Sequence, residues 1–156
     1  MGWWIVLAVV LTMAVAWAYF TAQRLNRLHI RTDSALQNLQ ASLDRRASLV
    51  EALIPEAAAP ARELLSVDYS MYSLDRRALL EARLEESLAK VASSPSRSLP
   101  PQVVDASARV GLAWRFYNDA VTDTRALRTR PVVRALRLGG TAPLPVYFEL
   151  PHAPEA

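Results

Sequence analysis

The residues that could carry out chemistry are few and scattered. His29 and His152 are the only histidines among the 156 residues, and neither lies at metal-ligand spacing from other donors. Glu81, Glu85 and Glu86 fall close together, but helical periodicity places them on an outer face as solvated charges. The absence of cysteine excludes disulfides, cysteine-based zinc sites, thiol nucleophiles and a lipoprotein anchor. With no glycine-rich phosphate loop either, we expect a protein that is not an enzyme and has no metal or other cofactor.

The sharpest polar motif is Arg115-Phe116-Tyr117-Asn118-Asp119. On a helical wheel Tyr117 falls in an apolar stripe, so its hydroxyl needs a buried partner. Asn118 borders that stripe and could reach a neighbouring helix. Arg115 and Asp119 lie four residues apart on the outer face, where a pair contributes only a few tenths of a kcal/mol. We interpret the motif as a lock on helix register, and the alternative is a patch that docks a partner.

Five arginines form a basic cluster near the C-terminus: Arg125, Arg128, Arg130, Arg134 and Arg137. The last three share one side of a short amphipathic segment. Near a membrane such a segment attracts anionic lipid, at about 1 kcal/mol per charge, whereas elsewhere it is simply a solvated face. If residues 56–65 form a bundle helix of their own, four segments alternate and the cluster returns toward the membrane. No aromatic platform or nucleic-acid motif accompanies the arginines, so we expect no nucleic-acid partner.

The elements that position these residues begin with an apolar run from Trp3 to Ala22, which contains no charge, proline or glycine. At about 1.5 Å per residue it spans about 30 Å, the thickness of a bilayer's hydrocarbon core. We predict a transmembrane anchor, with a buried core helix and a signal peptide as alternatives. No basic residue precedes the run, which disfavours a signal peptide. Aromatic residues suited to the membrane interfaces stand at both ends: Trp3 and Trp4, then Trp17, Tyr19 and Phe20.

Flanking charge predicts the orientation of this anchor. Only Met1 and Gly2 precede the run, whereas Arg24, Arg27 and Arg31 follow it closely. Under the positive-inside rule the arginine-rich side lies in the cytoplasm. We therefore expect a single-pass protein of the cell membrane, with its N-terminus outside and its body in the cytoplasm.

Prolines leave three long proline-free windows, residues 1–54, 61–94 and 102–130, and proline is excluded from helix interiors. In the first window, small or apolar residues recur every three to four positions from Leu25 to Ile54, as in a bundle or coiled-coil seam. We predict one helix from the apolar run to about Ile54, because no breaker separates the two. Further helices are predicted at about 75–92 and 102–129, and on the latter Phe116 and Leu127 widen the apolar face.

The predicted fold class is all-α, with one N-terminal transmembrane helix continuous with an antiparallel up-and-down bundle of three to four helices. The anchor would comprise residues 1–22, the bundle 23–140 and a proline-rich extended tail 141–156. Residues 56–65 decide between three and four helices. Near the C-terminus we expect a short basic helix from Pro131, stopped by Gly139-Gly140. Three tail residues are expected to cap the end of the bundle: Val146, Tyr147 and Phe148.

Two segments resemble the LemA family of bacterial membrane-anchored proteins. They are RLNRLHIRTDSALQNLQASLDRRASLV, directly after the apolar run, and RFYNDAVTDTRALR, near the C-terminus. Typical members repeat Tyr-Asn about six residues on, where this chain has Asp123-Thr124. The family's pattern of paired arginines, and of arginine, Tyr-Asn and valine, is matched at Arg45, Arg46, Arg115, Tyr117, Asn118 and Val121.

The resemblance implies an antiparallel helical bundle behind one N-terminal span, and it implies no catalytic residue or cofactor. Together with the residue patterns, it leads us to expect a non-catalytic, membrane-anchored scaffold or adaptor. Its expected partners are the membrane, a protein of the membrane or envelope, and possible further copies of the chain itself. The alternative is a module that binds anionic lipid or shapes the membrane.

Overall fold

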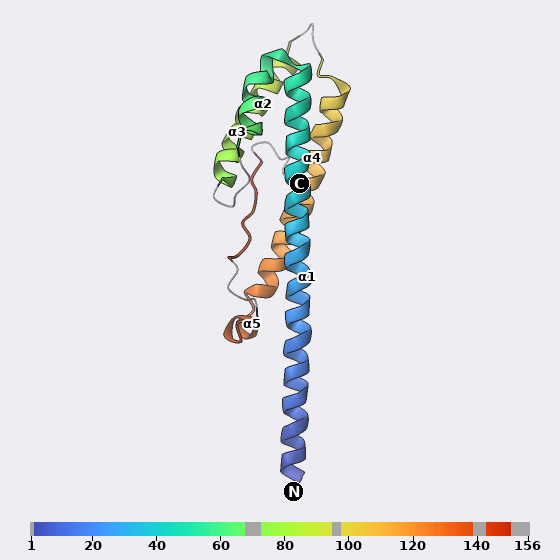
Figure 1. Ribbon diagram of the computed structural model, residues 1–156, viewed down its shortest axis with the longest axis vertical. Coiled ribbons are helices and arrows are strands. Elements are labelled where there is room, and N and C mark those ends of the chain that lie inside the picture. Colours follow the sequence, from blue (N-terminus) through green and yellow to red (C-terminus); the bar gives the residue numbers. More distant parts are fainter. Residues whose placement is uncertain (1, 68–72, 95–97, 139–142, 151–156) are drawn as a thin grey trace. The chain divides into compact units, whose positions relative to one another are not determined.

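The computed structural model describes residues 2–67, 73–94, 98–138 and 143–150 (Figure 1). These residues contain helices and no strand, so the predicted all-α class is confirmed. Contacts divide the chain into two compact units, unit 1 (Met1–Ser34 with Asp119–Val146) and unit 2 (Ala35–Asn118 with Tyr147–Ala156). The elements are α1 (Gly2–Leu53), a 3₁₀ turn (Pro55–Ala57), α2 (Ala58–Leu65), α3 (Leu74–Ala92), α4 (Pro101–Arg128) and α5 (Pro131–Ala135).

Helix α1 runs unbroken from the apolar segment into the bundle, as predicted. It ends where Ile54 takes an extended conformation (φ −128°, ψ 87°), because the residue before a proline is disfavoured in the helical region. Pro55 then opens the 3₁₀ turn, where its missing N–H costs little. The turn leads directly into α2, so residues 58–65 form a helix of their own and the bundle has four segments.

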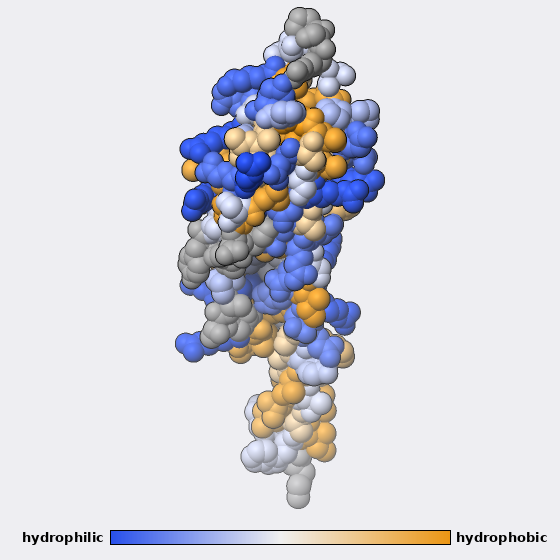
Figure 2. Space-filling view, turned by 45° about the horizontal axis from the view of Figure 1, so that its top comes forward, coloured by the Kyte–Doolittle hydropathy of each residue, from blue (hydrophilic) through white to orange (hydrophobic). Residues whose placement is uncertain are grey.

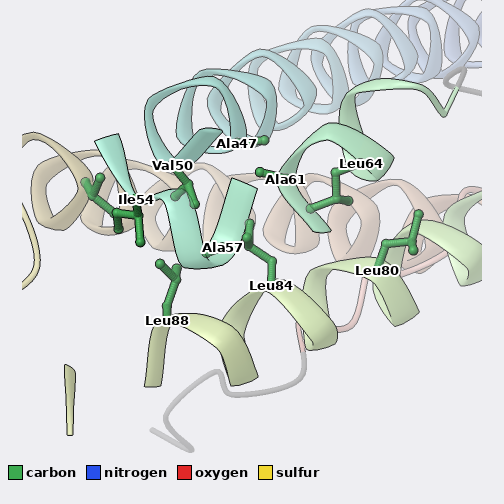
Figure 3. Close-up of a cluster of buried hydrophobic side chains, with 10 residues drawn as sticks. Ala47, Val50, Ile54, Ala57, Ala61, Leu64, Leu80, Leu84 and Leu88 are labelled. Carbon is green, nitrogen blue, oxygen red and sulfur yellow. The ribbon is translucent and has the colours of Figure 1, made fainter. Parts of the chain in front are cut away.

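In unit 2 the last part of α1, α2, α3 and the first part of α4 alternate in direction (Figure 1). Ala57 and Ala61 are fully buried, and such small side chains let the short α2 approach α1 and α3 closely. Leu80, Leu84 and Leu88 of α3 point toward the 3₁₀ turn and α2 (Figure 3). Each buried leucine contributes about 1.5–3 kcal/mol relative to an exposed one. The cluster comprises Ala47, Val50, Ile54, Ala57, Ala61, Leu64, Leu80, Leu84, Leu88 and Val103.

In unit 1 the end of α4 packs against α1 just beyond the apolar run. Leu25, Leu127 and Val133 form a small buried cluster. About two turns further along α1, the hydroxyl of Thr32 lies 2.9 Å from that of Thr124. Because Leu25 comes three residues after Ala22, these contacts bring the end of α4 and the start of α5 to the first turn after the run.

Helix α5 ends earlier than predicted. Its last residue is Ala135, and Arg137 takes a left-handed conformation with φ 49°. The N–H of Leu138 donates to the carbonyl of Val133 at 3.1 Å, and Leu138 also packs against Val133. These features form a Schellman cap, in which glycine usually takes the place that Arg137 holds here. Gly139 and Gly140, the predicted stop, lie outside the described residues.

The N-terminal part of α1 is long and apolar enough to cross a membrane, and it is the single helix of that kind among the described residues. None of its apolar window is buried, and Trp3 is 74% exposed. At the bottom of Figure 2 this segment is orange and pale, without strongly hydrophilic side chains. A buried core helix is therefore excluded. The five interfacial aromatics are all exposed or half-buried: Trp3, Trp4, Trp17, Tyr19 and Phe20.

Candidate functional site

The Tyr-Asn motif of α4 holds the C-terminal tail. Asn118 donates from Nδ2 to the carbonyl of Phe148 and accepts the Phe148 N–H at Oδ1, both at 3.2 Å. The indole N–H of Trp114 donates to the same carbonyl at 2.6 Å. Both of these Asn118 bonds are made to the backbone of the tail, whereas the sequence suggested that Asn118 could reach a neighbouring helix. Tyr117 beside it is buried, as the wheel predicted.

The tail does not cap the bundle in the way the sequence suggested. Phe148 is buried against the middle of α4, whereas Tyr147 and Val146 are largely exposed. A proline-rich segment makes no regular backbone ladder, so side chains of α4 must satisfy its backbone groups. Asn118 satisfies both the backbone N–H and the backbone carbonyl of Phe148.

The outer face of α4 carries an apolar stripe that the sequence analysis did not identify. Phe116 was expected to widen the buried face, but it is 53% exposed. Leu127, by contrast, is buried as expected. Phe116 continues a row of exposed apolar residues at four-residue intervals, which we call the α4 stripe: Val104, Ala108, Leu112 and Phe116. A search of the wheel for a second, weaker apolar face would have found it.

A buried charge network joins α1 to α3 inside unit 2. Arg46 donates to Glu81 at 2.5 Å and to Glu85 at 3.1 Å, and Arg77 donates to Asp44 at 2.7 Å. Glu81 is 1% exposed, so its predicted place among solvated charges is wrong. The signal was present in the sequence, because Arg77, Glu81 and Leu84 follow one another at helical spacing on the buried face of α3.

Burial dominates the electrostatics of this network. It raises the pKa of the Glu81 carboxyl above its ordinary value, and the Arg46 and Arg77 guanidinium groups only partly oppose that effect. Removing one partner from a buried pair leaves an uncompensated charge and costs about 3–5 kcal/mol. The network can therefore fix the register of α3 against α1. Glu86 is different, since exposed Lys90 at 2.7 Å lowers the pKa of its carboxyl.

The structure divides the basic cluster into two groups. Arg125 donates to the carbonyl of Pro145 and Arg128 to that of Pro143, each at 3.0 Å, so these two hold the tail. Arg130, Arg134 and Arg137 are exposed on and around α5. Only this second group is available to a ligand.

The remaining motif positions are structural or on the surface. Val121 is buried in α4, Arg45 and Arg115 are exposed, and Arg46 belongs to the charge network. His29 is half-buried on α1, and His152 lies outside the described residues. The residues that the structure describes contain no group of three or more side chains that could bind a metal ion together.

Comparison of the chain with protein-family models, with curated proteins and with solved structures gave no match. The resemblance to LemA therefore rests on the residues quoted above. Two of these residues make defined contacts in the structure. Arg46 is the centre of the charge network, and Asn118 binds the backbone of the tail.

Proposed function

We propose that this chain is a non-catalytic scaffold or adaptor of the LemA type, anchored in the membrane by the start of α1. Its bundle would hold another membrane protein through the α4 stripe. The observation that carries the proposal is the stripe itself, because an exposed apolar row that extends over about three helical turns is typical of an interaction surface. The proposed orientation follows the arginines after the anchor and places the bundle in the cytoplasm.

The occupant that best fits the stripe is an amphipathic helix of the partner. Side chains four residues apart form a ridge that packs into the groove of another helix. From Val104 to Phe116 the ridge is about 18 Å long, at 1.5 Å per residue. Charged residues of both signs border the ridge. Asp105 is paired with Arg109, and Arg115 lies further along the helix. An apolar centre with a polar, mixed-charge rim is the usual composition of a protein interface.

Photo-crosslinking in native membranes tests this proposal. A crosslinking residue at Leu112 should capture one membrane protein in stoichiometric yield, since this position lies within the ridge. The same residue at Leu79, an exposed leucine of α3, is the matched control and should capture nothing defined. Substituting Phe116→Ser and Val104→Ser should abolish the Leu112 crosslink while leaving the helical content unchanged.

Three other outcomes contradict the proposal. A Leu112 adduct of twice the chain's mass would assign the stripe to a second copy of the chain. Crosslinks to lipid alone would show that the stripe does not bind a protein. A crosslink that persists in the Phe116→Ser and Val104→Ser variant would show that the ridge does not bind the captured protein.

A further inference from the structure

We propose that α5 and the turn after it form a contact site for anionic lipid headgroups at the point where α1 leaves the membrane. This inference uses the anchoring part of the proposed function and is independent of the protein partner. It concerns unit 1 alone, where α5 packs on α1. Three independent observations carry it: the depth of α5, the character of its exposed face and the conformation of Arg137.

The depth of α5 follows from its contact with α1. Val133 of α5 belongs to the same small buried cluster as Leu25 of α1, and Leu25 comes three residues after Ala22, the end of the apolar run. At 1.5 Å per residue, Leu25 lies about 4.5 Å beyond the hydrocarbon edge. The headgroup region on each side of the hydrocarbon core is about 5 to 7 Å thick. The contact therefore places α5 at headgroup depth.

The exposed surface of α5 suits such a location. With Val133 turned toward α1, Val132 is 52% exposed and Leu136 is 55% exposed. Arg130, Arg134 and Arg137 of the same short segment are exposed as well. A short segment that exposes both apolar side chains and arginines suits a bilayer interface, because apolar groups enter the acyl boundary and guanidinium groups bind phosphate oxygens.

The charge around α5 is predominantly positive. Residues 20–32 of α1 and 124–138 of α4 and α5 contain eight arginines and no acidic residue. Arg31 is paired with Asp123 of α4, and Arg125 and Arg128 bind tail carbonyls. Arg24 and Arg27 join the three arginines around α5 as exposed charges. This excess favours an anionic surface over a zwitterionic one.

Arg137 itself points to a ligand. It holds the left-handed position of the Schellman cap, with φ 49°, where a side chain is disfavoured and glycine is usual. Backbone strain of this kind clusters at functional sites. The role that fits an exposed arginine beside Leu136 at headgroup depth is to bind lipid phosphate.

Single-cysteine spin labels test the proposal cleanly, because the chain has no cysteine of its own. The full chain is reconstituted in nanodiscs of phosphatidylcholine alone and of phosphatidylcholine with 30% phosphatidylglycerol. Collisions of the label with lipid-soluble oxygen and with a water-soluble nickel chelate are compared. A label at Leu11, within the apolar run, should be lipid-exposed in both bilayers and reports anchoring separately. A label at Leu79, 67% exposed on α3, should stay aqueous in both.

The decisive label is at Leu136. We expect it to shift from aqueous to lipid exposure when phosphatidylglycerol is added. Each arginine near an anionic surface changes the contact equilibrium about fivefold, so R130Q/R134Q/R137Q should abolish the shift. The charge-matched variant R76Q/R83Q/R109Q removes three exposed arginines from unit 2 and should leave the shift intact.

Each other outcome overturns the proposal. A Leu136 label that stays aqueous in both bilayers, while Leu11 is lipid-exposed, disproves the contact but preserves the anchor. Lipid exposure at Leu136 in both bilayers disproves recognition of anionic lipid. Equal effects of the two triple variants would show a general charge effect in place of a site. An aqueous label at Leu11 would instead contradict the anchoring on which the proposed function also depends.

Discussion

The two units fasten α1 in opposite ways. In unit 2, α1 is joined to α3 by buried charges, with Arg46 and Arg77 set among Asp44, Glu81 and Glu85. In unit 1, α1 is joined to α4 by the neutral hydroxyls of Thr32 and Thr124 and a small apolar cluster. In unit 2 the apolar core is large, and its contacts offset the desolvation cost of the buried charges, which can then fix how α3 pairs with α1. Where the core is small, neutral groups hold the helices and the arginines stay outside.

This contrast predicts its largest effect at Arg46. The substitution Arg46→Met leaves Glu81 buried without its closest partner, so the free energy of unfolding should fall by about 3–5 kcal/mol. Arg45→Met, at the exposed neighbour, is the control and should change it by less than about 0.5 kcal/mol. Urea unfolding of the full chain in detergent micelles, followed by circular dichroism, measures both. Equal effects of the two substitutions would remove the charge network from the account of unit 2.

The clamp on the tail should show an intermediate effect. Asn118→Ala removes both hydrogen bonds to the Phe148 backbone, which should cost about 1–3 kcal/mol because the bonds are partly buried. Arg128→Gln removes the exposed hydrogen bond to the Pro143 carbonyl and should cost less. Hydrogen exchange at the Phe148 amide provides the measurement, and it should quicken sharply in the alanine variant only. Unchanged protection there would show that the tail is held without Asn118, by contacts such as the Trp114 and Arg125 hydrogen bonds.

The neutral pair of unit 1 should give a smaller effect with a distinctive pattern. Thr32→Val leaves the Thr124 hydroxyl buried without the Thr32 hydroxyl and should cost about 1 kcal/mol. Adding Thr124→Val replaces both partners by apolar groups of similar shape, so the double variant should recover most of that loss. Urea unfolding of the three variants gives the coupling energy. A double variant less stable than either single one would contradict the description of this pair as a simple neutral lock.

The fold was more predictable than the site, for physical reasons. The apolar run, the unbroken α1 and the starts of α3 and α4 follow from local periodicity and proline positions, which act along the chain. The partner of Asn118 and the burial of Glu81 depend on which segments meet in space. A polar residue on the buried face needs a specific partner, and the sequence alone does not indicate which residue that partner is. The cap at Arg137 was missed because glycine is the usual signal for a helix end.

The smallest effect that we predict is a pH dependence with different signs at two glutamates of α3. Burial raises the pKa of Glu81 above 4.5, so between 4.5 and the raised pKa the folded state binds more protons than the unfolded state. Its contribution to the free energy of unfolding therefore falls as the pH rises through that window. Lys90 lowers the pKa of Glu86, so that group's contribution rises as the pH increases toward 4.5. Urea unfolding of the wild-type chain, Glu81→Gln and Glu86→Gln at pH 3 to 8 tests the signs. As the pH rises above 4.5, the stability difference between wild type and Glu81→Gln should decrease. As the pH rises toward 4.5 from below, the stability difference between wild type and Glu86→Gln should increase. A shared sign would mean that Glu81 is solvated, and unit 2 would then lose its buried charge.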